Sequence, residues 1–123
     1  MKILIVDDDK LILTVLSSKL KTKGYEIISA DNVIDALGIL QDQNINFIIS
    51  DIMMSGLSGL SLLSVLKEFH FHKIPLIFIS SLDQTNLISK SLGLGADDFI
   101  VKPINFGHLF LKIEQLTNSK DKN

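Results

Sequence analysis

The sequence predicts an α/β fold of the doubly wound class, in which helices cover both faces of a parallel sheet. Two observations predict it: five short apolar runs recur along the chain, and an amphipathic segment follows each of them. Strict alternation of this kind implies right-handed crossovers and a five-stranded parallel sheet. Several runs are unbroken in apolar character, as expected for strands that are buried on both faces. The predicted strands cover residues 3–6, 25–29, 47–50, 76–79 and 99–101.

The segments between these runs have the apolar spacing of helices that place one face against a core. The breaks carry residues that suit helix ends and strand entries, namely Gly24, Pro75, Gly93 and Gly95. The expected core stripes are Ile12, Leu16 and Leu20; Val33, Leu37 and Leu40; Leu62, Leu66 and Phe69; Ile88 and Leu92; and Phe106, Leu109, Phe110, Ile113 and Leu116.

Length and composition fit one globular domain. The chain has 123 residues and is 46% hydrophobic, so it can bury one core without disulfides or a structural metal. We expect the domain to cover residues 1–117 and the polar residues 118–123 to form a frayed tail or the stub of a linker. There is no cysteine, no secretory signal pattern and no apolar run of about 18 residues. The expected compartment is therefore the cytoplasm.

The charge pattern argues against nucleic acid as a direct partner. The formal net charge is −2, and all 12 basic residues are lysines that are scattered singly along the chain. Arginine is the favoured side chain for phosphate and guanine contacts, and the sequence contains none.

Polar residues directly follow four of the predicted strands. In open α/β sheets, ligands bind beyond the carboxyl ends of the strands, so we expect these side chains to meet at one edge of the sheet. They are Asp7, Asp8 and Asp9; Asp51; Ser80 and Ser81; and Lys102 with Pro103.

Clustered carboxylates need a positive counter-charge, because each close pair repels by about 4 kcal/mol at an intermediate effective dielectric. Lys102 can supply one charge, and a divalent cation can supply two. Mg²⁺ suits this set, since it is commonly held by one or two carboxylates together with waters and a phosphate oxygen. A carboxylate beside Mg²⁺ and lysine is also a nucleophile suited to phosphoryl transfer.

Four segments that contain these polar residues form a pattern in order and spacing. They are Ile3-Leu-Ile-Val-Asp-Asp-Asp9, Ser50-Asp-Ile-Met-Met54, Pro75-Leu-Ile-Phe-Ile-Ser80 and Gly95-Ala-Asp-Asp-Phe-Ile-Val-Lys-Pro103. Through them the sequence resembles the response-regulator receiver family of two-component systems over roughly residues 1 to 117. The resemblance implies the flavodoxin-like version of the doubly wound (βα)5 fold, with strand order 2-1-3-4-5.

The resemblance implies that Asp51 is the phosphoacceptor. Asp8 is expected to bind Mg²⁺ directly, Asp7 mainly through metal-bound water, and the backbone carbonyl of Met53 is expected to complete the protein ligands. The family also implies a phosphoryl donor, which is a sensor histidine kinase or a histidine phosphotransfer protein. The domain would catalyse only its own phosphorylation and its own slow dephosphorylation.

The resemblance also assigns the parts of a switch. Lys102 is expected to pair with Asp51 or its phosphoryl oxygens, and Ser80 to hydrogen-bond the phosphoryl group in the active state. Phe99 matches the switch aromatic, whose rotamer follows Ser80, and the bond between Lys102 and Pro103 is expected to be cis. A downstream protein or an output domain would receive the signal, and a phosphorylation-dependent dimer is left open.

Four positions depart from the family pattern. Ser55 and Ser58 replace a usual proline and a frequent aspartate, which predicts a softer loop after Asp51. Ser81 replaces a common alanine beside the switch hydroxyl, and Ile104 replaces a common aromatic after Pro103.

Several residues near the expected site have plainer interpretations. Asp9 is expected to be the N-cap of the first helix, and Met54 an ordinary packing residue. His70 and His72 lack an evident third ligand for a metal, and His108 is expected at the surface.

Two other functions compete with the phosphoryl-accepting switch. The first is an interaction module that has kept the fold but works without phosphorylation; such a module is expected to lose an acid, the hydroxyl or the lysine, and all are present here. The second is a flavin carrier, which needs a phosphate-binding loop after the first strand. At that position this sequence has Asp7-Asp-Asp9, whose negative charges would repel a phosphate.

Overall fold

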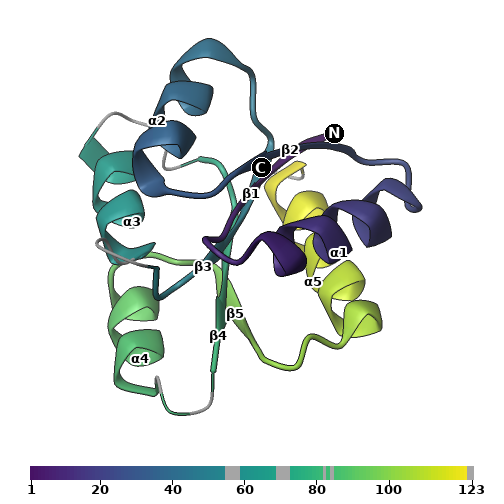
Figure 1. The fold of residues 1–123 in the computed structure, drawn as a ribbon. Coiled ribbons are helices and arrows are strands. Elements are labelled where there is room, and N and C mark those ends of the chain that lie inside the picture. Colours follow the sequence, from purple (N-terminus) through teal and green to yellow (C-terminus); the bar gives the residue numbers. More distant parts are fainter. Residues whose placement is uncertain (55–58, 69–72, 82, 84, 122–123) are drawn as a thin grey trace.

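The computed structural model describes residues 1–54, 59–68, 73–81, 83 and 85–121, and it confirms the doubly wound (βα)5 fold. All strand pairs are parallel, and the sheet order is β2-β1-β3-β4-β5 (Figure 1). The elements are β1 (Lys2–Val6), α1 (Lys10–Lys21), β2 (Glu26–Ala30), α2 (Val33–Asp42), β3 (Phe47–Asp51), α3 (Gly59–Glu68), β4 (Leu76–Ser80), α4 (Thr85–Gly93), β5 (Asp98–Val101) and α5 (Phe106–Asp121).

The sheet separates two hydrophobic cores. Helices α2, α3 and α4 lie on one face of the sheet, and α1 and α5 lie on the other (Figure 1). Alternate residues of one strand enter different cores, as expected from the two-residue period of a strand. In β3, for example, Ile48 packs toward α2 and α3, whereas Phe47 and Ile49 pack toward α1 and α5.

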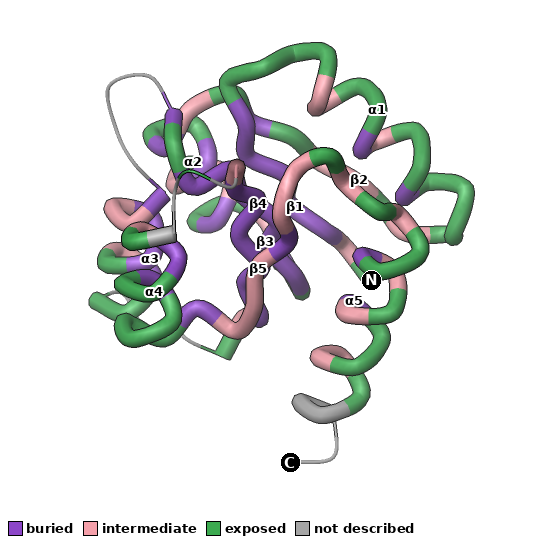
Figure 2. The backbone as a smooth tube through the Cα atoms, turned by 90° about the horizontal axis from the view of Figure 1, so that it is seen from below, coloured by how far each residue is buried: buried purple, intermediate pink, exposed green. Residues whose placement is uncertain are grey.

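Burial follows the position of each strand in the sheet. The described residues of β3 and β4 are all buried, and so are those of β1 after Lys2. The edge strands β2 and β5 are only partly buried, and the outward faces of the helices are exposed (Figure 2). The unbroken apolar runs of the sequence are therefore the central strands.

Side-chain caps fix the starts of three helices. Asp9 caps α1, Asn32 caps α2 by accepting a hydrogen bond from the Asp35 amide at 2.8 Å, and Asn105 accepts one from the His108 amide at 3.0 Å. At their ends, α1 and α4 are followed by Gly24 and Gly95, whose φ angles of +88° and +110° favour glycine.

Helix α4 differs from the predicted stripe. Ile88 is buried as expected, but Leu92 is 40% exposed, and the buried position next to Ile88 is Ser91. The hydroxyl of Ser91 donates to the Ile88 carbonyl at 2.8 Å, so its burial leaves no unsatisfied donor. Phe69 of the predicted α3 stripe lies outside the described residues.

The last helix, α5, ends at Asp121 and so includes residues 118–121 of the polar terminal segment. Within the described residues, no helix has both the length and the apolar character that crossing a membrane requires.

Candidate functional site

The carboxyl ends of four strands bring the predicted site residues to one edge of the sheet. Backbone hydrogen bonds extend the sheet past the strand ends: the Asp7 amide donates to the Ala30 carbonyl at 3.1 Å, and the Ile52 amide donates to the Ile79 carbonyl at 3.0 Å. The Lys102 amide likewise donates to the Ser80 carbonyl at 2.8 Å. The main chain of the site is therefore held by the rigid part of the fold.

Asp7 is buried, and only one of its carboxylate oxygens has a hydrogen-bond partner. Oδ1 accepts from the Asp9 amide at 2.9 Å, whereas Oδ2 has no partner among the described residues. Burial is the main cause that raises the pKa of Asp7 to about 6; the Asp9 amide and Lys102 oppose this rise, and the charges of Asp51 and Asp8 add to it.

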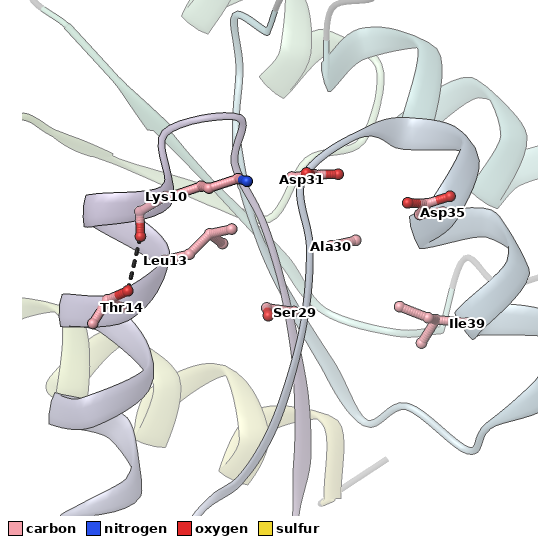
Figure 3. Close-up of a pocket in the computed structure, with 8 residues that line it drawn as sticks. All are labelled: Lys10, Leu13, Thr14, Ser29, Ala30, Asp31, Asp35 and Ile39. Atoms are coloured by element: carbon pink, nitrogen blue, oxygen red, sulfur yellow. Dashed lines mark hydrogen bonds between the residues drawn. The ribbon is translucent and has the colours of Figure 1, made fainter.

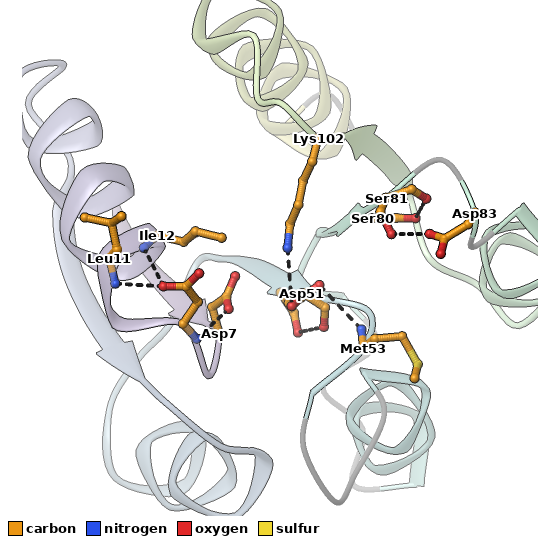
Figure 4. Close-up of polar contacts among 11 residues, drawn as sticks. Asp7, Leu11, Ile12, Asp51, Met53, Ser80, Ser81, Asp83 and Lys102 are labelled. Carbon is orange, nitrogen blue, oxygen red and sulfur yellow. Dashed lines mark hydrogen bonds and ion pairs between the residues drawn. The ribbon is translucent and has the colours of Figure 1, made fainter.

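Asp9 faces the helix rather than the pocket. Its Oδ1 accepts from the amides of Leu11 at 2.9 Å and Ile12 at 3.4 Å, which confirms its interpretation as the N-cap of α1 (Figure 4). The packing interpretation of Met54 is also confirmed, because this side chain is buried in the core on the α2–α3 face.

Three carboxylates converge in the pocket. One oxygen each from Asp7, Asp8 and Asp51 lies within 4.8 Å of the others, with Asp8 exposed and the other two buried. A buried carboxylate oxygen without a donor, next to two further carboxylates, fits a hard divalent cation that takes oxygen ligands. The donor set therefore suits Mg²⁺.

Asp51 lies between two acidic residues, Asp7 and Asp8, and Lys102. Among the described residues, Lys102 is the only lysine in an ion pair with Asp51. The amino group of Lys102 is 3.6 Å from Asp51 Oδ2, and the Met53 amide donates to Asp51 Oδ1 at 3.4 Å (Figure 4). Burial raises the pKa of Asp51 above its ordinary value, while Lys102 and the Met53 amide act in the opposite direction. The main chain of Met53 thus lies beside the carboxylates, and the residue as a whole is 46% exposed.

Ser80 reaches the same edge, but its hydroxyl is directed elsewhere. It is buried and donates to the Ser81 carbonyl at 2.9 Å, and the Ser81 hydroxyl in turn donates to Asp83 Oδ1 at 2.5 Å (Figure 4). The structure therefore brings Asp51 and Lys102 together without the Ser80 hydroxyl.

Two further predicted residues, Phe99 and Pro103, belong to β5 and to the segment that follows it. Phe99 pairs with Phe78 in the sheet register and packs, half-buried, against the core on the α2–α4 side. The peptide bond between Lys102 and Pro103 is cis. His108 is exposed, and Ser55, Ser58, His70 and His72 lie outside the described residues.

Gly59 is a supporting residue that the sequence did not reveal. Its amide donates to the Ile52 carbonyl at 2.8 Å, and a Cβ atom there would lie 2.6 Å from Phe78 Cε1 and 2.8 Å from the Asp51 carbonyl oxygen. The first turn of α3 can approach the end of β3 only because this residue lacks a side chain. The only local signal is a glycine at a predicted helix start, which is too common to single it out.

Comparison with known proteins identifies the family. The family model described as "Response regulator receiver domain" matches residues 3–114. The chain belongs to this family. It is thus a receiver domain of the two-component type, and every site residue described above lies within the matched range.

Curated relatives of this receiver domain are longer proteins. The chain is 34% identical over 122 residues to "Nisin biosynthesis regulatory protein NisR" of Lactococcus lactis subsp. lactis, covering 99% of this chain and 52% of the relative. It is 39% identical over 111 residues to "Two-component response regulator-like PRR37" of Oryza sativa subsp. indica, covering 88% of this chain and 15% of the relative. The chain therefore spans about half of the first relative and less of the second.

Solved receiver domains have the same fold. The structure of the Francisella response regulator 1452 receiver domain superposes with a TM-score of 0.87 at 31% identity, covering 96% of this chain and 97% of the other. A receiver domain protein from Clostridium thermocellum gives a TM-score of 0.91 at 26% identity, covering 98% and 96%.

Proposed function

We propose that this receiver domain works in the cytoplasm, where it takes a phosphoryl group onto Asp51 from a histidine kinase or a histidine phosphotransfer protein. The reaction is Mg²⁺-dependent, and the phosphorylated domain changes its binding to a downstream protein or output domain. The observation that carries this proposal is the position of Asp51, with Lys102 3.6 Å away on one side and the carboxylates of Asp7 and Asp8 on the other.

Asp51 acts as the nucleophile. One of its carboxylate oxygens forms a bond to phosphorus while the bond between phosphorus and the donor's imidazole nitrogen breaks. The bonding electrons stay on that nitrogen, and the leaving imidazole is neutral if its ring carries one proton. Lys102 shifts Asp51 toward the ionised form that this attack needs, because it lowers the carboxylate's pKa.

Asp7, Asp8 and Asp51 are the side chains that would hold Mg²⁺, with the Met53 carbonyl as the backbone ligand. When bound, the ion supplies the positive charge that offsets both the carboxylates and the phosphoryl oxygens. The partnerless Oδ2 of Asp7 supports this assignment, since a buried carboxylate oxygen is stabilised by a cation or a donor.

Phosphorylation gives the Ser80 hydroxyl a new acceptor. In the present structure this hydroxyl donates to the Ser81 carbonyl, so bonding to a phosphoryl oxygen requires the Ser80 side chain to give up that hydrogen bond. A charged acceptor gives a stronger hydrogen bond than a carbonyl does. In this proposal Phe99 follows that movement and changes the surface near α4 and β5.

An apolar groove of about 350 Å³ borders the acid pocket and is the proposed docking site of the phosphoryl donor. It runs between α1 and the segment after β5, and its lining includes Leu11, Val15, Ile104 and Phe106. Lys102 also lines it, and its amino group is 3.6 Å from Asp51 Oδ2, so a protein seated there would lie beside the phosphoacceptor. Leu11 is 71% exposed, which leaves apolar surface for a helix of the donor to cover.

The test is labelling with acetyl phosphate and Mg²⁺, followed by intact-mass analysis. We expect one phosphoryl group, which is lost in Asp51→Asn and retained in the control Asp42→Asn. Label that persists in Asp51→Asn would move the acceptor to another residue. A wild-type protein that folds, binds Mg²⁺ and is labelled by neither acetyl phosphate nor phosphohistidine would instead be a phosphorylation-independent interaction module.

A further inference from the structure

Two consecutive hydrogen bonds join Ser80, the last residue of β4, to Ser81 and Ser81 to Asp83. The first runs from the Ser80 hydroxyl to the Ser81 carbonyl at 2.9 Å, and the second from the Ser81 hydroxyl to Asp83 Oδ1 at 2.5 Å (Figure 4). The Ser80 end of these two hydrogen bonds is held in the sheet, because the Ser80 carbonyl accepts a hydrogen bond from the Lys102 amide at 2.8 Å. The far end, Asp83, is exposed and lies just before α4.

A hydroxyl group has a single proton to donate. Ser80 can therefore donate to the Ser81 carbonyl or to a phosphoryl oxygen on Asp51, but not fully to both. Whether the Ser81 carbonyl stays within reach depends on the orientation of the Ser81 main chain. Asp83 can influence that orientation, because its carboxylate accepts a hydrogen bond from the Ser81 hydroxyl.

We propose that Asp83 is a positioning residue that acts through Ser81 to hold Ser80 in its resting position. This Ser81–Asp83 latch rests on the proposed function, since it opposes the movement by which Ser80 reaches the phosphoryl group. The latch is a property of this chain's own residues: a hydroxyl at position 81 and a carboxylate two residues later.

The latch predicts a definite change in affinity for a phosphoryl mimic. A ligand that binds only the switched form has an apparent affinity reduced by the fraction of molecules in that form. One hydrogen bond that favours the resting form makes this fraction smaller. Removing it is expected to increase the apparent affinity about three- to tenfold, the range that one net hydrogen bond provides.

The experiment titrates the full chain with beryllofluoride in saturating Mg²⁺ and follows the backbone amide signals of Phe99 and Lys102 by NMR. Beryllofluoride is a non-covalent mimic of a phosphoryl group on a carboxylate. We expect half-saturation at about three- to tenfold lower concentration for Ser81→Ala and for Asp83→Ala than for wild type. Asp83→Asn keeps an acceptor oxygen and is expected to lie between wild type and Asp83→Ala.

Two controls separate the latch from general effects. The double variant Ser81→Ala/Asp83→Ala is expected to match either single variant, because both substitutions remove the same bond. Ser89→Ala removes an exposed hydroxyl from α4 and is expected to leave the titration unchanged. Mg²⁺ affinity without beryllofluoride is expected to be the same in all of these proteins.

Each outcome decides between the two proposals. A wild-type protein that binds Mg²⁺ but never responds to beryllofluoride overturns the proposed function, and the latch with it. A wild-type response that Ser81→Ala and Asp83→Ala leave unchanged or weaken overturns the latch alone. Additive effects of the two substitutions also overturn it, because they would show that the residues act separately.

Discussion

The amino group of Lys102 lies 3.6 Å from Asp51 Oδ2, beyond the usual length of a direct charge-assisted hydrogen bond. The lysine side chain is 31% exposed, whereas that of Asp51 is only 7% exposed. The pair therefore combines a fixed, buried acid with a lysine that retains room to move. In the proposed function, this freedom lets the amino group of Lys102 move to the oxygens of a phosphoryl group on Asp51.

Lys102→Ala is expected to keep Mg²⁺ binding but to lose much of the conformational response to phosphorylation. In the proposed function Lys102 holds the phosphoryl oxygens of Asp51 in one geometry, a contact that exists only after modification. The measurement is the change in amide NMR signals of α4 and β5 on addition of beryllofluoride, with the exposed Lys90→Ala as control. A response equal to that of wild type would reject this role for Lys102.

Asp7→Asn is expected to stabilise the domain in the absence of divalent cations at pH 7.5. Burial raises the pKa of Asp7 from 3.8 to about 6, so ionising it destabilises the folded state as pH rises through that interval. The gain is about 1–3 kcal/mol of unfolding free energy at pH 7.5, and it disappears near and below pH 4.

Urea unfolding of wild type and Asp7→Asn at pH 7.5 and at pH 4 measures this effect. The same unfolding experiment with added Mg²⁺ is the second measurement. Added Mg²⁺ is expected to stabilise wild type more than Asp7→Asn, because the variant lacks one of the carboxylates proposed to hold the ion. A stability difference that is the same at both pH values would show that the Asp7 charge is not its cause.

Gly59→Ala is expected to destabilise the fold by about 1–3 kcal/mol, because the added Cβ has no space beside Phe78 and the Asp51 carbonyl. Gly38 is the matched control: it lies inside α2, and a Cβ there meets nothing within 4 Å. Gly38→Ala is expected to stabilise by about 0.5–1 kcal/mol through helix propensity. Chemical denaturation measures both values, and equal effects of the two substitutions would contradict the packing argument.

The phosphorylated state is expected to be long-lived. Hydrolysis needs a water held in line with the acyl phosphate, usually by an amide or carboxylate side chain. The positions that flank the path of this water are two residues after Asp51 and two residues after Ser80 in the sequence. They are Met53, whose amide contacts Asp51, and Leu82, which is outside the described residues. Both side chains are apolar and carry no amide or carboxylate. Met53→Asn together with Leu82→Glu is expected to speed loss of phosphate several-fold. Decay rates after donor removal test this, and a wild type that decays as fast as the double variant contradicts it.

Leu11→Asp is expected to slow phosphotransfer from a protein donor but not labelling by acetyl phosphate. The charge is placed in the apolar groove beside Lys102, where it disfavours docking of an apolar helix face without touching Asp51. Ile34→Asp is the matched control, because Ile34 is also 71% exposed but belongs to α2. If both variants slow the protein donor equally, the groove is not the docking site.

The sequence predicted the sheet well because strand identity here depends on local apolar character. The ends of the predicted strands differ by one residue or fewer from the observed ones, and Asp9 was recognised from its position before a helix. The strict alternation of strands and helices predicts that Asp7, Asp51, Ser80 and Lys102 lie at one edge of the sheet. It does not predict the distances between their side chains.

Features that depend on distant neighbours were not predictable in the same way. Apolar spacing assigned Leu92 to the core of α4, whereas the structure buries Ser91, whose hydroxyl is satisfied within its own helix. The need for glycine at position 59 arises from Phe78, which is far away in sequence. Nor does a serine at a strand end reveal which acceptor its hydroxyl uses.

The sheet separates two hydrophobic cores, one on each of its faces. The groove proposed for the donor is built on the α1 and α5 side, whereas Phe99 packs on the side of α2, α3 and α4. In the proposed function, substitutions at Leu11 or Val15 that alter which donor is accepted would therefore fall in a different hydrophobic core from substitutions that alter the response of Phe99. Apart from Lys102, which belongs to both parts, one set could diversify in evolution without repacking the other.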